Sequence, residues 1–226
     1  MELKDKVIIV TGALGTLGRA VSSAAFDAGA QVIAIDCVDG EPVDGVHGRP
    51  ALDLNDSEAT QKAMAAVANE YGRIDALVNV AGGFVWETLE SGSIDTWDKL
   101  YQINVRTAVN ASKAVLKYIP ETGGRIVSVS AAGAVKAQAG LGAYAASKSG
   151  VARFTEALAE EVKARNITVN AVMPSIIDTQ PNRNDMPDAD FSTWVTPQAL
   201  ADVILFLLSE RAEAVTGALI PVSGRV

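Results

Sequence analysis

The chain has 226 residues, 49% of them hydrophobic, which is enough to bury the core of one large domain. Its 27 acidic residues outnumber 19 basic ones and no basic cluster interrupts them, which argues against a nucleic-acid-binding role. The longest strongly apolar run, residues 203–208, is far shorter than the roughly 20 residues that span a bilayer, and no signal-peptide pattern precedes the first strand. We therefore expect a cytoplasmic protein with no membrane or nucleic-acid partner.

The chain has one cysteine, Cys37, and one histidine, His47. A single cysteine rules out an internal disulfide and a cysteine-cluster metal site, and we expect no bound metal. His47 lies in a Gly/Pro-rich stretch typical of an exposed loop, and no Gly-x-Ser-x-Gly motif accompanies it. The sequence therefore argues against a hydrolase with a Ser-His-Asp triad.

Short β-branched runs alternate with longer amphipathic stretches along the chain. The expected strands cover residues 7–10, 31–35, a short segment ending at 52, 74–80, 125–129, 167–172 and 218–222. The expected helices cover residues 16–28, 57–71, a long helix capped by Asp95 and broken near Pro120, 143–165 and 197–208. Residues 37–50 and 174–195 are expected to be long loops.

This alternation predicts a parallel sheet covered by helices on both faces. Right-handed crossovers make a doubly wound Rossmann fold the natural outcome, as one α/β domain of about seven strands over residues 1–226. Ligands in such folds bind at the carboxyl ends of the strands, so functional residues are expected directly after each strand.

A glycine-rich turn follows the first strand. Gly12, Gly15 and Gly18 recur every third residue, which turns the chain tightly and lets the backbone approach a pyrophosphate. The helix that begins at Thr16 and Leu17 supplies N–H groups and the positive end of its dipole. Because the motif lies between a strand and a helix, it predicts a dinucleotide site.

The second strand ends in Asp36, 18 residues after Gly18. A carboxylate at this position accepts hydrogen bonds from the adenosine ribose and repels a 2′-phosphate. No Arg or Lys follows it in residues 37–40. We therefore predict NAD rather than NADP as the cofactor. The alternative is an aspartate that only starts a turn.

A run of small residues follows the fourth strand, beginning at Asn79. Ala81 and Gly82 leave room for a dinucleotide to lie close to the backbone. The Asn79 amide can tie neighbouring strand ends together.

Tyr144 and Lys148 lie four residues apart on one expected helix and therefore face the same way. A free tyrosine has a pKa of about 10 and is a poor base at neutral pH, but a neighbouring ammonium lowers that pKa. Such a pair can exchange a proton with a carbonyl or an alcohol. A Tyr-x-x-x-Lys spacing alone is weak evidence, and its value depends on the motifs around it.

Together these motifs resemble the short-chain dehydrogenase/reductase family over essentially the whole chain. The resemblance is carried by residues 11–18, Asp36, Asp53 and Leu54, residues 79–82, Asn104, Ser130, residues 144–148 and residues 174–179.

The resemblance implies roles for four catalytic residues. Tyr144 is the acid/base, and Lys148 binds the nicotinamide ribose and tunes Tyr144. Ser130 hydrogen-bonds the substrate oxygen, and Asn104 holds a water that links Lys148 to solvent.

Four further residues are implied to contact the cofactor. Asp53 and Leu54 flank the adenine, while Ile177 and Thr179 lie near the carboxamide of the nicotinamide.

The chain departs from the family pattern at three places. Thr16 stands where glycine is common, and Ser175 follows Pro174 where glycine is expected. Ser130 lies 14 residues before Tyr144, one more than is usual.

The substrate is expected over the nicotinamide, between Ser130 and Tyr144, under a lid formed by residues 174–195. Trp86 and Trp194 are the predicted substrate residues. Further aromatic or flexible side chains could line the pocket, and each could equally be core: Phe84, Met186 and Phe191. An apolar or aromatic ketone or alcohol is the predicted substrate class.

Two alternatives stay open. Residues 178–194 and the aromatic after Gly83 resemble dihydropteridine reductase, which implies reduction of a pterin with NADH. Those reductases lack the serine partner, so Ser130 favours carbonyl chemistry. The other alternative is a nucleotide-binding sensor without turnover.

The family resemblance also implies a homo-oligomer, a dimer or a tetramer, packed through the two long helices. The Ala-rich face of the helix over residues 143–165 permits close helix packing.

Overall fold

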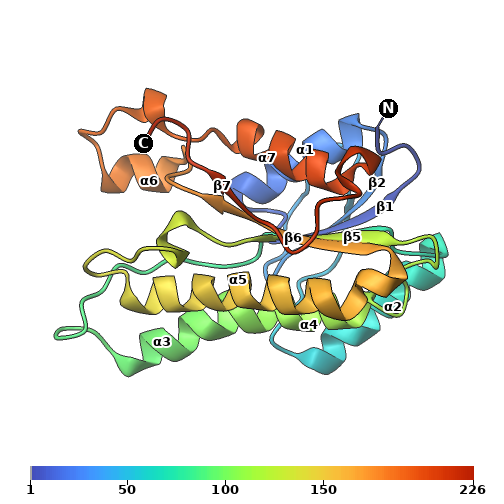
Figure 1. Ribbon diagram of the computed structural model, residues 1–226, viewed down its shortest axis with the longest axis horizontal. Helices are drawn as coiled ribbons and strands as arrows, with labels where there is room; N and C mark the ends of the chain where they lie inside the picture. The colour runs from blue at the N-terminus through green and yellow to red at the C-terminus, as the bar shows by residue number, and fades with distance from the viewer. Residues whose placement is uncertain (1) are drawn as a thin grey trace.

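The computed structural model describes residues 2–226, and one parallel sheet of seven strands forms its centre (Figure 1). The strands are β1 (Val7–Thr11), β2 (Gln31–Ile35), β3 (His47–Gly48), β4 (Ala76–Asn79), β5 (Gly124–Val129), β6 (Ile167–Pro174) and β7 (Leu219–Val222). Their spatial order is β3-β2-β1-β4-β5-β6-β7, and every neighbouring pair is parallel. The predicted doubly wound α/β fold is confirmed.

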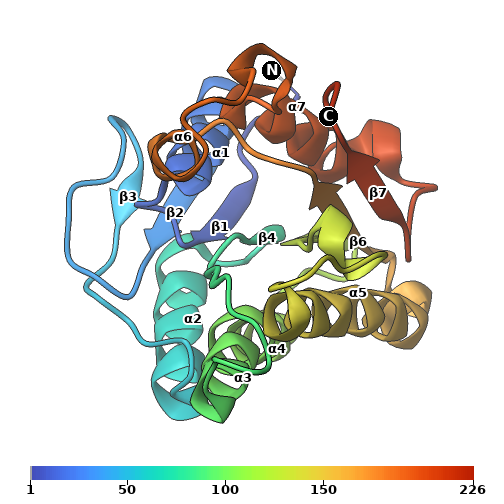
Figure 2. The same cartoon turned by 90° about the vertical axis from the view of Figure 1, so that its left-hand side faces the viewer.

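Helices cover both faces of the sheet (Figures 1 and 2). One face carries α1 (Thr16–Asp27) and α7 (Pro197–Leu208), and the other carries α2 (Ser57–Tyr71), α4 (Thr107–Val115) and α5 (Gly142–Val162). Two shorter helices, α3 (Ile94–Tyr101) and α6 (Gln180–Asp185), lie toward the end of the molecule where the strands finish. Within residues 2–226, no helix combines the length and the apolar character needed to cross a bilayer.

The strands bury both of their faces, which explains their near-continuous apolar sequences. Every residue of β1 and of β6 is buried. The order of the strands reverses at the β1–β4 pair, and ligands in open α/β sheets bind at the carboxyl ends of the strands at such a point. The register pairs Thr11 with Asn79 and Asn79 with Ser128, so the ends of β1, β4 and β5 are level.

Helix α2 begins and ends where the sequence predicts, and each end has a local cause. The Asp56 carboxylate accepts the N–H groups of Glu58 and Ala59, both at 2.9 Å, and so caps the first turn. Gly72 ends the helix with a φ of +82°, a conformation that favours glycine.

The predicted long helix is present as a continuous helical stretch over residues 94–115, but its cap is not Asp95 and it contains a π-helical turn. Ser93 is the cap, because its hydroxyl accepts the Asp95 N–H at 3.1 Å and leaves Asp95 inside the first turn. A π-helical turn, Gln102–Arg106, then separates α3 from α4, and α4 ends at Val115, before Pro120.

One expected strand and one expected loop are also corrected. The third strand is the pair His47–Gly48 and does not reach Leu52, whose N–H instead bonds the Asp36 carbonyl at 2.8 Å. Residues 174–195 are not wholly irregular, because they contain α6 and a 3-10 turn at Phe191–Thr193.

Candidate active site

Two of the three predicted glycines are required by the packing of the turn itself. Gly12 has a φ of +62°, and a Cβ there would lie 2.8 Å from the backbone of Ala81. A Cβ on Gly18 would lie 2.1 Å from the Gly12 carbonyl oxygen. Gly15 differs, because its Cβ would meet only that oxygen, at 3.4 Å, and the residue is exposed.

The open side of the turn is the N-terminus of α1. Gly15 is the N-cap and provides no side-chain oxygen, and the first turn holds no acidic residue. The free N–H groups and the positive end of the helix dipole therefore face an exposed surface, where an anion is favoured. This arrangement fits the pyrophosphate of a nicotinamide dinucleotide.

Asp36 lies beside this turn at the carboxyl end of β2. Its carboxylate accepts the Leu14 N–H at 2.9 Å and the Cys37 N–H at 2.8 Å, so it is held against the nucleotide side. Sequence reasoning missed Arg19, which follows Gly18 directly. Its guanidinium donates to the carbonyls of Leu14, at 3.0 Å, and Glu41, at 2.9 Å, and so closes residues 36–41 onto the turn.

Thr11 and Asn79 tie the strand ends together at the reversal of strand order. The Thr11 hydroxyl accepts the N–H groups of Val80 and Ala81, both at 3.2 Å. The Asn79 amide donates to Ser128 on β5 at 3.2 Å, which confirms the predicted tie between neighbouring strands. The same amide nitrogen also donates to the Ser112 hydroxyl on α4, at 3.1 Å.

Asn104 lies on the π-helical turn, a feature that is frequent at functional sites. Its amide exchanges two hydrogen bonds with the backbone of Gly83, at 2.9 and 3.1 Å, and donates a third to Ser147 on α5 at 2.9 Å. The Asn104 carbonyl oxygen and the Lys148 ammonium both lie beside Gly82, where a Cβ would meet them at 2.4 and 3.4 Å. The structure therefore brings Gly82, Asn104 and Lys148 together.

The pair on α5 has unusual acidities. Burial lowers the pKa of Lys148 to about 8, and the ammonium donates to the Val129 carbonyl at 2.8 Å. Burial also raises the pKa of Tyr144 to about 12. The expectation that Lys148 lowers the Tyr144 pKa is therefore wrong here, because desolvation dominates and the ammonium is turned toward Val129.

Ser130, the predicted partner of the substrate oxygen, is 1% exposed. Its hydroxyl donates to the backbone carbonyl of Lys148 at 2.8 Å. The structure therefore places Ser130 next to the Tyr144–Lys148 pair, with its one proton engaged by α5.

A family model described as short chain dehydrogenase matches residues 6–190. The chain belongs to the short-chain dehydrogenase family. It is an oxidoreductase of the group that acts on CH–OH donors with a nicotinamide dinucleotide.

Two curated relatives of this short-chain dehydrogenase match it along its whole length. The 3-oxoacyl-acyl-carrier-protein reductase FabG of Thermotoga maritima is 34% identical, over 99% of this chain and 98% of the relative. The D-threitol dehydrogenase of Mycolicibacterium smegmatis is 33% identical, over 99% and 93%. Among solved structures, carveol dehydrogenase from Mycobacterium avium in complex with NAD has a TM-score of 0.88 at 27% identity and covers 99% of this chain and 98% of its own.

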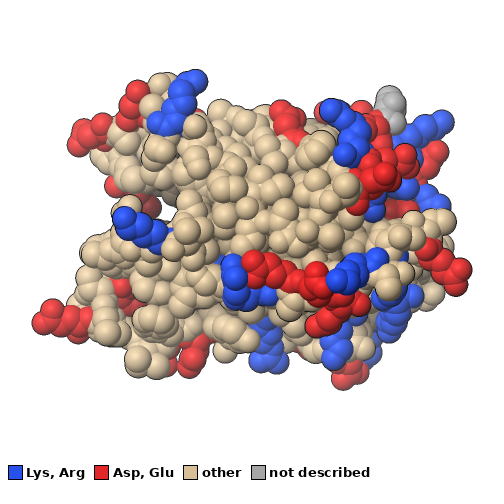
Figure 3. Space-filling view, in the orientation of Figure 1, with Lys and Arg blue, Asp and Glu red and all other residues tan. Residues whose placement is uncertain are grey.

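The predicted substrate side of the dehydrogenase is hollowed between the α6 segment and the layer of α3 and α5 (Figure 3). Phe84 lies edge-on against the Tyr144 ring, with centroids 4.9 Å apart, and is 54% exposed. Trp86, a predicted substrate residue, is 61% exposed and covers Gly140, where a Cβ would lie 2.3 Å from its ring. Trp194, the other predicted substrate residue, is 6% exposed and packs on Phe191, which favours a core role.

A cavity of about 210 Å³ adjoins this side. It lies between residues 87–97 and residues 138–143, and Trp97 forms part of its wall. No sequence motif marked this cavity.

The four remaining predicted cofactor residues lie in the turn before α2 or in the 174–195 segment. Asp53 caps its own turn through the Asn55 N–H at 2.8 Å, and Leu54 is buried. Ile177 bridges to Val195, and the Thr179 hydroxyl caps α6. Their contacts with a cofactor stay a prediction.

Proposed function

We propose that this dehydrogenase interconverts a ketone or aldehyde and an alcohol, with NAD as its cofactor. One observation carries the proposal: Tyr144 and Lys148 lie one turn apart at the start of α5, and the Lys148 ammonium adjoins Gly82, beyond the carboxyl end of β4. The nicotinamide, when bound, supplies or accepts the hydride.

Tyr144 is the proton donor in the reducing direction. Because burial raises the pKa of its phenol to about 12, the hydroxyl is protonated at neutral pH and ready to donate to a carbonyl oxygen. Lys148, whose pKa burial lowers to about 8, would return a proton to the phenolate by turning its ammonium from the Val129 carbonyl to the phenol. Asn104 holds the loop at Gly83 against α5 and so keeps the pair in place.

Asp36 supports the preference for NAD. Its carboxylate lies at the end of β2 and would repel a 2′-phosphate. The guanidinium of Arg19, which bonds the same turn and loop, is engaged by two backbone carbonyls. NADH is therefore expected to be used better than NADPH.

The proposal is tested with a panel of ketones and aldehydes and NADH deuterated at C4 of the nicotinamide. Transfer of deuterium to the former carbonyl carbon, detected by mass spectrometry, is the expected result. Tight binding of NADH without transfer to any acceptor would refute the proposal and favour a nucleotide sensor.

Reduction of a pterin is a second candidate, and the position of Ser130 favours it. The sequence favoured carbonyl chemistry because Ser130 was expected to donate to the substrate oxygen. In the structure the Ser130 hydroxyl instead donates to the Lys148 carbonyl at 2.8 Å. Quinonoid dihydropterin therefore belongs in the same panel, and a rate well above that of every ketone would select this candidate.

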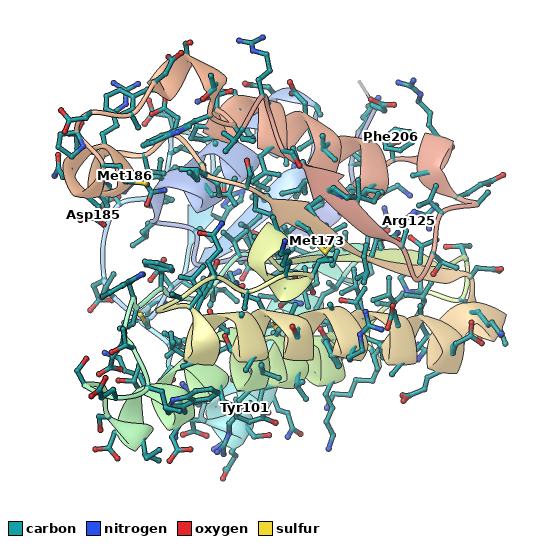
Figure 4. All side chains as sticks on the ribbon, turned by 60° about the vertical axis from the view of Figure 1, so that its left-hand side comes forward. Tyr101, Arg125, Met173, Asp185, Met186 and Phe206 are labelled. Atoms are coloured by element: carbon teal, nitrogen blue, oxygen red, sulfur yellow. The ribbon has the colours of Figure 1, made fainter. Side chains whose placement is uncertain are left out.

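We also propose a homo-oligomer formed through the outer side of α3 and the helices that follow it. Ile94, Trp97 and Tyr101 lie on one side of α3 at helical spacing, and Tyr101 is 57% exposed and points away from the sheet (Figure 4). Analytical ultracentrifugation should show a dimer or tetramer that Tyr101→Glu weakens. A monomer in the wild type at micromolar concentration would contradict this.

A further inference from the structure

Residues 174–195, which connect β6 to α7, fold as a unit of their own. The Asp178 N–H donates to the Val195 carbonyl at 2.8 Å, and the Val195 N–H donates to the Ile176 carbonyl at 3.0 Å, so the two ends of the segment run side by side. Inside the segment, the Arg183 guanidinium binds both carboxylate oxygens of Asp178, at 2.6 and 2.7 Å. Because these bonds close within the segment, it would move as one body about its two ends.

The chain that follows β7 fastens the start of this segment. The Ser175 hydroxyl donates to the Ser223 carbonyl at 2.8 Å, and the Ser175 N–H donates to the Val222 carbonyl at 3.1 Å. The pairing of β6 with β7 is therefore continued beyond the last residues of both strands.

The same part of the chain also fastens the end of the segment. The Arg225 N–H donates to the Thr193 carbonyl at 2.9 Å, and the Arg225 guanidinium donates to the Ser192 carbonyl at 3.0 Å. Both acceptors lie in the 3-10 turn Phe191–Thr193. A bond from a charged guanidinium is stronger than one between neutral groups, so this end is held by a backbone bond and a charged one.

Gly224 makes the close approach of these residues to the segment possible. Its φ is +60°, and a Cβ there would lie 2.6 Å from the Thr193 carbonyl oxygen, the same atom that accepts the Arg225 N–H. A side chain at position 224 would therefore push residues 223–225 away from the segment.

We propose that residues 223–225 form a strap that holds the 174–195 segment over the substrate side, and that the strap thereby sets the affinity of the enzyme for its substrate. The inference rests on the proposed function and on the predicted role of this segment as the substrate lid. The hollow lies between the α6 segment and the layer of α3 and α5, so a shift of the segment as one body would open it (Figure 3). Gly224 and Arg225 are positioning residues, because they touch the segment and not the substrate.

The kinetic effect of the strap follows from the fraction of molecules in which the segment is in place. The apparent dissociation constant of a ligand rises in inverse proportion to the fraction of the protein that is competent to bind it. Tyr144 and Lys148 lie on α5, which none of the strap's bonds reaches, so proton transfer in the bound complex should keep its rate. Loss of the strap should therefore raise KM and leave kcat almost unchanged.

Gly224→Ala is the stronger test, with acetophenone as the acceptor at saturating NADH. We expect KM for acetophenone to rise about tenfold and kcat to stay within about twofold, because the new Cβ displaces the strap. Hydrogen exchange measured by mass spectrometry should be faster over residues 176–195. Gly217→Ala is the matched control: its φ is similarly positive, at +68°, but its Cβ would meet only the Ala159 side chain, at 3.6 Å, so neither quantity should change.

Arg225→Met tests the same strap without adding backbone strain. The loss of the guanidinium bond should raise KM about threefold and speed exchange over residues 176–195, again with kcat within about twofold. Arg165→Met is its control, because the Arg165 guanidinium donates to the Leu116 carbonyl just before β6 begins, at the end of the strand away from the substrate side. This variant should change neither KM nor the exchange.

Either of two results would overturn the inference. One is unchanged exchange over residues 176–195 in Arg225→Met, which would show that the strap does not hold the segment and which is decisive even if Gly224→Ala fails to fold. The other is a fall in kcat of about tenfold or more at an unchanged KM in either strap variant, because residues 223–225 would then act on the reaction itself. Failure of the proposed function is distinct: the wild type would then reduce no ketone, while the exchange measurements would still test the strap.

Discussion

The proposed nucleotide side and the proposed substrate side of this dehydrogenase differ in whether backbone groups or side chains form them. The proposed nucleotide side is made mostly by backbone: a glycine turn and the uncapped N-terminus of α1, together with one carboxylate, Asp36, that is held by two N–H groups. The substrate side is made by side chains that bond backbone carbonyls, such as Ser130 and Lys148, and by exposed aromatics, such as Phe84. The first arrangement can bind one cofactor in many relatives, and the second leaves substrate choice to a few side chains.

The largest loss of stability and of NADH binding is expected from a substitution in the glycine turn after β1. Gly18→Ala should destabilise the protein by about 3 kcal/mol and abolish NADH binding, because the new Cβ lies 2.1 Å from the Gly12 carbonyl oxygen. Gly15→Ala is the matched control for stability, since its Cβ meets a protein atom only at 3.4 Å. Urea unfolding measures the stability of both variants, and NADH fluorescence measures binding by Gly18→Ala. Equal losses of stability in the two variants would contradict a turn fixed by backbone packing.

The burial of Lys148 can be tested through the pH dependence of the protein's stability. The lysine has a pKa of about 8 in the folded chain and 10.5 in the unfolded one, so between these values the unfolded state binds more protons. The stability of the wild type relative to Lys148→Met should therefore rise with pH from 8 to 10.5, by up to about 3 kcal/mol, and stay constant below pH 8. Urea unfolding at several pH values measures this, and parallel stability curves would contradict it.

The contrast between the two sides also explains what sequence reasoning could predict. Asp56 and Gly72 mark the ends of α2 by local chemistry, and the glycine spacing marks the turn in the same way. The π-helical turn at Asn104 needs no special residue, and no local signal shows which way the Ser130 hydroxyl points. Arg19 was missed because only residues next to Asp36 in sequence were considered, while folding brings α1 beside that loop.

A substitution at Asp36 should have a smaller effect, on the choice between NADH and NADPH. Asp36→Asn should raise the ratio of kcat/KM for NADPH to that for NADH by about tenfold, because the charge that repels a 2′-phosphate is removed. Asp39→Asn is the control, as Asp39 lies in the same loop and caps the Ala51 N–H at 2.9 Å. The same shift in both variants would point to overall charge rather than to Asp36.

Phe84 should give the smallest effect. Phe84→Leu should reduce the preference for an aromatic ketone over cyclohexanone about threefold, the size expected from an aromatic contact. The unfolding midpoint should hardly change, because the residue is 54% exposed. Phe206→Leu, the same substitution at an exposed position of α7 on the other face of the sheet, should change neither quantity. An unchanged preference in Phe84→Leu would remove this ring from the substrate side.

The most direct test of the central claim is the rate of NADH oxidation by Tyr144→Phe, measured together with NADH affinity. The variant keeps the ring that packs on Phe84 and removes only the hydroxyl. We predict a fall in kcat of roughly 10³-fold or more, with NADH affinity and the unfolding midpoint unchanged. A rate within about tenfold of the wild type would contradict the account, because Tyr144 would then not be the proton donor.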